Sequence, residues 1–338
     1  MKKEKGPSVV VVIPFYNGSP FIERALRSVF EQSTPPDEVI VVNDGSRVSE
    51  RDFLHALAAR LPFRVIDKPN GGQGSARNAG VMATKSDFIC LLDQDDFFLE
   101  THIEVLTRSL PINDRKFGFL YADLKIADVD GNIFFTTIVK IKSTENPKTS
   151  LINLLKDDMF VLPSASIISR KAFEAVGGFD EQFTGYEDDD LFMRLFHKGY
   201  TNYFVDEPVT VWCVHSASTS FSIKMSTSRF RYFKKLMATF VDQEDRGLFF
   251  FRDCLLPRFL HQFVGDAVGA VDKDEAHRTA VYEILRDFST AVLANRYVGR
   301  RQKVKLMLTT FLLTNDFPGS RFVFKGARRL PFVRRFVF

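Results

Sequence analysis

Hydrophobic and polar positions in the first hundred residues alternate between two periods. Residues 9–13 are a continuous β-branched run, typical of a strand buried on both faces, and apolar side chains recur at helical spacing over residues 20–32. The alternation continues with strands predicted over 38–42, 63–66 and 88–92 and helices over 49–60 and 75–83. This order predicts an α/β fold with a Rossmann-like, mostly parallel sheet flanked by helices, whose ligands bind beyond the carboxyl ends of the strands.

After residue 92 the pattern becomes mixed and then helical. Strands are predicted over 117–127, from 133 onward, and over 165–168 and 209–214, with short helices over 170–176 and 188–198. Long helices are predicted over 229–241, 248–266 and 276–295. We therefore expect a first domain over residues 1–220 and a mainly helical C-terminal region over residues 221–338.

Composition narrows the class of protein. The chain has 338 residues, of which 45% are hydrophobic and 26% charged, which excludes collagen-like, disulfide-scaffold and wholly disordered proteins. No segment supplies the roughly 18 apolar residues of a membrane span. The three scattered cysteines form no metal or disulfide pattern, so a cytoplasmic location is expected. The 36 phenylalanines predict either an aromatic core or an aromatic surface.

Charge is divided unevenly along the chain. The net charge is +4, but residues 219–338 carry 22 Lys and Arg against 11 Asp and Glu, a net +11, which leaves −7 for residues 1–218. Residues 300–338 hold ten basic residues and one acid, Asp316, mixed with apolar side chains. Such a segment is typical of a contact with an anionic membrane surface, which would hold the protein on the inner face of the membrane. The alternative is that it packs on the domain or on a second subunit; no nucleic-acid motif accompanies the charge.

Candidate chemistry lies at the ends of the predicted strands. Asp93, Asp95 and Asp96 directly follow the strand over 88–92. Capping a helix needs only one carboxylate, whereas Mg²⁺ or Mn²⁺ takes one or two and completes its shell with phosphate oxygens. The loop therefore predicts a metal–diphosphate site, with a helix cap as the alternative. Asp44, after the strand over 38–42, is explained equally well by a turn when taken alone.

Two further segments carry polar chemistry. The glycine-rich residues 70–78 fail the dinucleotide fingerprint, because Arg77 stands where its third glycine belongs; we expect a loop that offers Arg77 and backbone amides to an anion. Residues 187–190 are four consecutive acids at the start of an apolar helix. Asp190 can pair with Arg194, and the remaining acids include a candidate general base.

Five segments, in order, resemble family 2 glycosyltransferases, the inverting, nucleotide-sugar-dependent class with the GT-A fold. They are Val-Val-Ile-Pro-Phe-Tyr-Asn at 11–17, Val-Asn-Asp-Gly-Ser at 42–46, Gly-Ser-Ala-Arg-Asn-Ala-Gly at 74–80, Leu-Asp-Gln-Asp-Asp at 92–96 and Gly-Tyr-Glu-Asp-Asp-Asp-Leu at 185–191. The resemblance covers residues 8–220 and does not extend to residues 221–338.

The resemblance implies roles for individual residues. Asp188 matches the catalytic base, and Asp95 and His215 match positions near the metal and the diphosphate. The family often has an arginine two positions before that histidine, where this chain has Cys213. The positions that match the nucleotide pocket are Pro14, Tyr16, Asn17, Asp44, Arg77, Asp93 and Gln94.

The mechanism implied is a single displacement. Asp188 takes the proton of an acceptor hydroxyl as it attacks the anomeric carbon of a nucleoside diphosphate sugar, expected to be a UDP-sugar, and Mn²⁺ or Mg²⁺ neutralises the departing diphosphate. The acceptor expected is a saccharide or lipid-linked saccharide of a bacterial surface polysaccharide. The alternatives are a nucleotidyltransferase on a similar sheet and a non-catalytic protein that binds nucleotide sugars or glycans.

Overall fold

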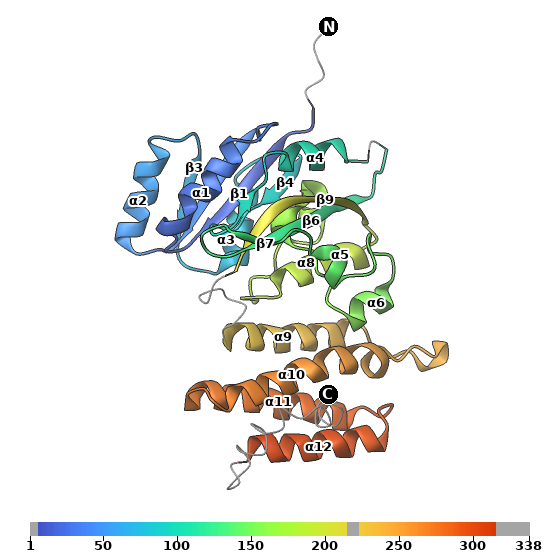
Figure 1. Ribbon diagram of the computed structural model, residues 1–338. Coiled ribbons are helices and arrows are strands. Elements are labelled where there is room, and N and C mark those ends of the chain that lie inside the picture. Colours follow the sequence, from blue (N-terminus) through green and yellow to red (C-terminus); the bar gives the residue numbers. More distant parts are fainter. Residues whose placement is uncertain (1–5, 112, 215–222, 316–338) are drawn as a thin grey trace. The chain divides into compact units, whose positions relative to one another are not determined.

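A computed structural model describes residues 6–111, 113–214 and 223–315 of the chain (Figure 1). The chain divides into two compact units, and each is described separately. The first comprises residues 1–149 and 159–218, and the second comprises residues 150–158 and 219–338. The sequence pattern contains no sign that residues 150–158 belong with the helical region.

One mixed sheet forms the first unit. Within the described residues its strand order is β3-β2-β1-β4-β8-β6-β9-β5, with β7 paired to β6. The pairs β1–β2, β1–β4, β2–β3 and β6–β9 are parallel, and the other pairs are antiparallel. The strands are β1 (Val9–Phe15), β2 (Glu38–Asp44), β3 (Arg64–Lys68), β4 (Phe88–Leu91), β5 (Phe97–Phe98), β6 (Phe117–Ala127), β7 (Ile133–Phe135), β8 (Ser166–Ser169) and β9 (Thr201–Cys213).

Helices flank this sheet, and the strand and helix alternation predicted from the sequence is confirmed. The strand β1 is buried along its whole length, as its β-branched run predicts. Helix α3 packs so closely on β1 that a Cβ on Gly80 would lie 2.3 Å from Val12 Cγ1. The helices of this unit are α1 (Ser19–Phe30), α2 (Val48–Ala58), α3 (Gln73–Met82), α4 (His102–Arg108), α5 (Val139–Lys142), α7 (Arg170–Ala175) and α8 (Glu187–His197).

Strand β9 begins eight residues before the strand predicted over 209–214. Its first part contains Asp206, Glu207 and Pro208, which are poor strand formers. Pro208 pairs with Asp123 of β6 where the register shifts, and a bulge of this kind is where a sheet accepts a proline. The parallel partner β6 therefore extends the strand through residues that the sequence does not favour.

The second unit is helical. Its helices are α6 (Leu151–Lys156), α9 (Ile223–Thr239), α10 (Leu256–Ala270), α11 (Glu275–Ala294) and α12 (Arg300–Thr314). The single helix predicted over 248–266 is instead a π-helical turn over Phe251–Leu255 followed by α10. Pro257 explains the irregularity, because it has no N–H for the ordinary helical bond. No helix within the described residues is long and apolar enough to cross a membrane.

Phenylalanine rings build the core of this helical unit. Phe233 lies at the centre, with ring centroids of Phe259, Phe263 and Phe288 at 5.4, 5.9 and 5.1 Å. All four side chains are at most 1% exposed. Tilted and edge-on contacts at these distances are the favourable geometry for aromatic pairs. The phenylalanine excess therefore packs a core, as one of the two interpretations of the composition predicts.

His102, at the start of α4, is fully buried in the first unit. Its ring stacks on Phe98 with centroids 3.5 Å apart. Nδ1 lies 3.2 Å from the Val209 carbonyl oxygen, which can only accept, so Nδ1 carries the proton of the neutral ring. Nε2 is buried without a hydrogen-bond partner. Burial lowers the pKa of His102 to about 3, so the ring stays uncharged in the folded protein.

We expect His102 to make stability depend on pH. Between about pH 6.5 and pH 3 the unfolded chain binds a proton at this ring and the folded chain does not, so the free energy of unfolding falls as the pH is lowered through this range. The slope contributed is up to ~1.4 kcal/mol per pH unit. His102→Asn should show a shallower slope in urea unfolding. Equal slopes in the two proteins would refute the assignment.

Candidate active site

Loops at the carboxyl ends of β1, β2 and β4 are tied together, as the sequence predicts. The Tyr16 N–H donates to Gln94 Oε1 (2.9 Å), which joins the loop after β1 to the loop after β4. The Asn17 N–H donates to Ser46 Oγ (3.0 Å), which joins it to the loop after β2. Pro14 is buried, whereas Tyr16 is 52% exposed. The edge of the sheet therefore presents an aromatic ring beside three polar loops.

Asp44 holds the loop that follows β3. Its Oδ1 accepts from Lys68 Nζ (2.7 Å) and the Gly71 N–H (2.9 Å), and its Oδ2 accepts from the Gly72 N–H (2.8 Å). Gly45 follows with φ of 70°, and a Cβ there would lie 2.5 Å from a backbone nitrogen of the same loop. The backbone amides that the sequence offers to an anion are thus bound to the chain's own carboxylate. Contact of Asp44 with a nucleotide base stays a prediction.

Arg77 joins two acidic segments that are far apart in sequence. Its side chain is 3% exposed, Nη2 donates to Asp93 Oδ1 (2.6 Å) and Nη1 to Glu187 Oε1 (3.2 Å). Gln73 Nε2 donates to the same oxygen of Asp93 (2.6 Å). Burial acts to lower the pKa of Arg77, but the charges of Asp93 and Glu187 outweigh it, and the pKa is raised. The guanidinium therefore brings the acidic loop after β4 and the start of α8 to one place.

Replacing Arg77 with Ala should destabilise the protein by about 3–5 kcal/mol, because it leaves Glu187 as a buried charge without its cation. Urea unfolding measures the change. Arg27→Ala, at an exposed position of α1, is the matched control and should stay within about 0.5 kcal/mol of wild type. A loss below about 1 kcal/mol for Arg77→Ala would contradict a buried ion-pair network.

The three acids after β4 have different surroundings. Asp96 is 2% exposed, and its Oδ1 accepts from the Cys213 N–H at the end of β9 (2.9 Å). Burial, together with the charges of Asp93 and Asp95, holds the pKa of Asp96 well above its usual value. Asp93 is bound to Arg77, and Asp95 is half-buried. Asp96 is therefore a buried structural acid, whereas Asp93 and Asp95, which precede it in the loop, lie nearer the surface.

The four acids of α8 are also distinguished by their contacts. Glu187 is 5% exposed, and its Oε2 accepts from the Gly185 N–H (2.8 Å). Asp190 pairs with Arg194 (2.7 Å), as the sequence predicts, although the pair is more buried than a surface pair. Asp188 is half-buried, and its Oδ1 accepts from the next backbone N–H (2.9 Å). Its charge acts on Arg77, so Asp188 lies in the same network.

The carboxylate oxygens of Asp93 and Asp95 are the hard ligands that Mg²⁺ and Mn²⁺ prefer. Among the residues that the structure describes, no three His, Cys, Asp or Glu side chains converge to hold a metal by themselves. A cation that takes one or two carboxylates and substrate phosphate fits this donor set. His215 lies outside the described residues. Cys213, two positions earlier, has its Sγ 3.3 Å from Arg24 Nη2.

Three residues of this network were not predicted as site residues. Gln73 and Lys68 bind the carboxylates of Asp93 and Asp44, and Glu187 anchors Arg77. Glu187 had a sequence signal, since it stands beside Asp188 in the same acidic run. Lys68 and Gln73 had only their positions at the end of β3 and the start of α3.

Comparisons with known proteins find related sequences and structures. The model of the glycosyl transferase family 2 matches residues 10–177, and a model described as the N-terminal domain of galactosyltransferase matches residues 163–217. The uncharacterized glycosyltransferase YwdF of Bacillus subtilis is 30% identical over 237 residues, which are 68% of this chain and 82% of YwdF. An uncharacterized glycosyltransferase of Rickettsia bellii is 30% identical over 191 residues, which are 56% of this chain but 27% of the relative.

Solved structures share the fold. S. aureus TarS 1–349 in complex with UDP-GlcNAc superposes with a TM-score of 0.67 at 16% identity, over 95% of this chain and 91% of that one. The mannosyltransferase PcManGT from Pyrobaculum calidifontis, in complex with GDP-Man and Mn²⁺, gives a TM-score of 0.57 at 15% identity, over 99% of this chain and 86% of that one. The fold is therefore of the GT-A type. With the family model and YwdF, this shows that the chain belongs to glycosyltransferase family 2.

Proposed function

We propose that the chain transfers a sugar from a nucleoside diphosphate sugar to a hydroxyl group, with inversion at the anomeric carbon. The observation that carries this proposal is the bridge from Arg77 to Asp93 and Glu187, which brings a metal-binding type of loop and a helix with a half-buried acid together. A displacement at an anomeric carbon needs both, one for the leaving diphosphate and one for the acceptor proton.

The donor would bind along the loops after β1, β2 and β4. Tyr16 offers an exposed ring for stacking, and Asp44 is buried at the end of β2. UDP is the nucleotide expected, supported by the UDP-GlcNAc in the TarS structure. PcManGT binds GDP-Man, so GDP-sugars are tested as well. Asp95 would hold Mn²⁺ or Mg²⁺, which supplies charge neutralisation to a departing diphosphate, and Asp93 would lie nearer the ribose.

Asp188 would serve as the general base. Of the four acids at the start of α8, Glu187, Asp189 and Asp190 are at most 7% exposed, and Asp188 is half-buried. A base must reach the proton it takes, so the more accessible carboxylate is the better candidate. One displacement with a base on the acceptor oxygen gives inversion.

The acceptor proposed is a saccharide or lipid-linked saccharide of a bacterial surface polysaccharide, with the protein at the inner face of the membrane. The basic residues of 300–338 support this location. His215 is proposed beside the metal and the diphosphate, on the resemblance alone.

A panel of UDP-, GDP- and TDP-sugars, screened by thermal shift with Mn²⁺, should identify one donor that raises the melting temperature. NMR of the product made from that donor should then show the inverted anomer. Release of pyrophosphate from a nucleoside triphosphate and a sugar phosphate would instead indicate a nucleotidyltransferase. Donor binding without hydrolysis or transfer would indicate a non-catalytic binding protein.

A further inference from the structure

Helix α12 carries apolar side chains on two faces. Leu306 and Leu313 are each 4% exposed and belong to the core of the helical unit, where α12 packs on α11. A second apolar set, spaced three and four residues apart, is about half exposed and forms one stripe along the helix. This outer stripe consists of Val304 (50%), Met307 (47%), Leu308 (52%), Phe311 (52%) and Leu312 (47%). The outward face of a packed helix is ordinarily polar, so a half-exposed apolar stripe there is a candidate contact surface.

Basic residues surround the outer stripe. Arg300 and Arg301 begin the helix, and α12 contains no Asp or Glu. With 3.6 residues per turn, Lys303 and Lys305 fall on opposite sides of the stripe. An apolar stripe between flanking lysines is the pattern of a helix that lies in a bilayer surface, where the lysine stems follow the apolar layer and the ammonium groups reach the headgroups.

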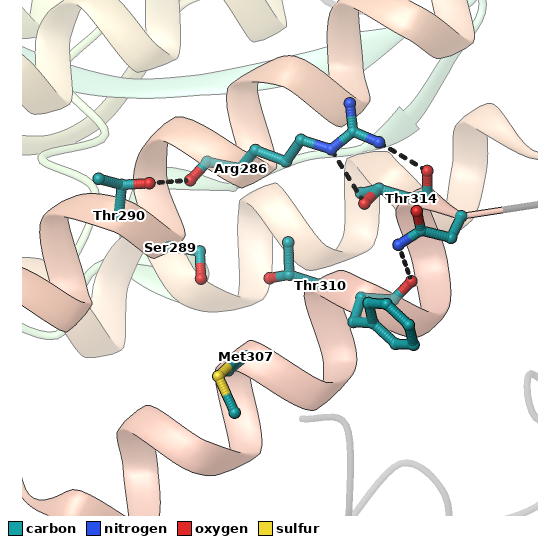
Figure 2. A pocket seen from close by; sticks show the side chains of 8 residues that line it. Arg286, Ser289, Thr290, Met307, Thr310 and Thr314 are labelled. Atoms are coloured by element: carbon teal, nitrogen blue, oxygen red, sulfur yellow. Dashed lines mark hydrogen bonds between the residues drawn. The ribbon is translucent and has the colours of Figure 1, made fainter.

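An open cavity of about 270 Å³ lies between α11 and α12, beside the stripe (Figure 2). Met307 and Phe311 line it and also belong to the stripe. On its far side Arg286 donates from Nε to Thr314 Oγ1 (3.1 Å) and from Nη2 to the Thr314 carbonyl (2.7 Å). Thr310 is 8% exposed, and its Oγ1 has no hydrogen-bond partner. Figure 2 shows this side chain between the helices, on the side of Ser289.

We propose that the outer stripe of α12 docks on an anionic phospholipid bilayer, with the adjoining cavity taking the phosphate of a headgroup. A phosphate oxygen can accept from the Thr310 hydroxyl and from the Arg286 guanidinium, which supplies a partner for the buried hydroxyl. This deepens the proposed function, because it holds the enzyme where a lipid-linked acceptor is found. The docking itself requires no sugar transfer.

Charge favours a bilayer over two other occupants of the stripe. A second copy packed through the same face would bring its own Arg300, Arg301, Lys303 and Lys305 against these four, and like charges oppose such an interface. Residues 316–338 of the chain carry six Lys and Arg against one acid, so their net charge has the same sign as this face. An anionic headgroup layer is complementary to it.

The test is sedimentation of the full chain with vesicles of phosphatidylglycerol and phosphatidylcholine in equal parts, compared with pure phosphatidylcholine. Wild type should pellet with the first and not with the second. Leu308→Glu/Leu312→Glu should lower the partition coefficient at least tenfold. Met82→Glu/Val241→Glu, which adds the same two charges at positions 82% and 64% exposed, is the matched control and should pellet like wild type.

Two milder variants separate charge from the cavity. Lys303→Gln/Lys305→Gln should weaken binding to anionic vesicles roughly fivefold for each charge removed. Thr310→Val keeps the shape of the side chain and should weaken it by roughly threefold to tenfold. A wild-type value for Thr310→Val would overturn the headgroup site.

Equal pelleting of Leu308→Glu/Leu312→Glu and wild type, or equal pelleting of wild type on both kinds of vesicle, would overturn the docking surface. The docking surface would also be overturned if neither protein bound vesicles and if wild type were a dimer, and Leu308→Glu/Leu312→Glu a monomer, in sedimentation velocity. Thermal shift with the identified donor should be unchanged in every variant. A variant that loses vesicle binding but keeps the thermal shift with the donor would therefore leave the sugar-transfer proposal standing.

Discussion

Asp188→Asn should lower turnover roughly 10²- to 10⁴-fold while leaving donor affinity unchanged. The amide keeps the size of the carboxylate but cannot take a proton from the acceptor hydroxyl. The fold should tolerate the change, because Asp188 is half-buried and Arg77 keeps Asp93 and Glu187 as partners. Single-turnover transfer and calorimetric titration of the donor measure the two quantities separately.

Asp287→Asn, an exposed position of α11, controls for the loss of one carboxylate. If Asp188→Asn loses donor binding, Asp188 belongs to the nucleotide site and not to the acceptor. If turnover is unchanged, the base is another acid. Glu187 and Asp189 are then the acids to test.

Asp95→Ala should abolish the part of donor binding that depends on Mn²⁺, with the fold intact. Removing one acid relieves repulsion in a loop where burial and the neighbouring charges already raise the pKa of Asp96. The backbone carbonyl of Asp95, which accepts from Arg24 Nη2 (2.8 Å), is unaffected by the substitution. Calorimetry with and without Mn²⁺, together with a thermal unfolding curve, tests both statements.

Chelation supplies the matched control for Asp95. EDTA should reduce wild-type donor affinity to the level of Asp95→Ala and have no effect on the variant. A variant that binds donor and Mn²⁺ like wild type would show that the cation is held elsewhere.

The candidate site could be predicted only as a set of segments. Asp93, Asp95 and Asp96 look equivalent in sequence, and only burial under β9 makes Asp96 a structural acid. Asp190 and Arg194 are four residues apart on one helix, so their pairing could be predicted, but their burial depends on the packing of α8. Arg77 and Glu187 are 110 positions apart. No local pattern places them together, because their contact depends on how the sheet orders its strands.

The fold was predicted best where local signals agree with packing. The strand β1 is buried along its whole length, and helix α1 buries the apolar residues that recur at helical spacing in the sequence. The start of β9 and the π-helical turn before Pro257 were missed for one reason: a proline interrupts the local pattern, and a neighbouring element stabilises the backbone around it.

The chain passes between the two units three times, because residues 150–158 leave the first unit and residue 159 returns to it. In the second unit, Leu154 and Leu155 of α6 are 3% and 0% exposed, and Arg258 Nη1 donates to the Leu154 carbonyl (2.9 Å). A chain shortened to residue 218 keeps these leucines and loses α10 and the π-helical turn, on which α6 packs. The helical unit therefore cannot be removed by cutting the chain at one point. Recombination could exchange it between enzymes only if residues 150–158, which lie inside the sequence of the first unit, were exchanged with it.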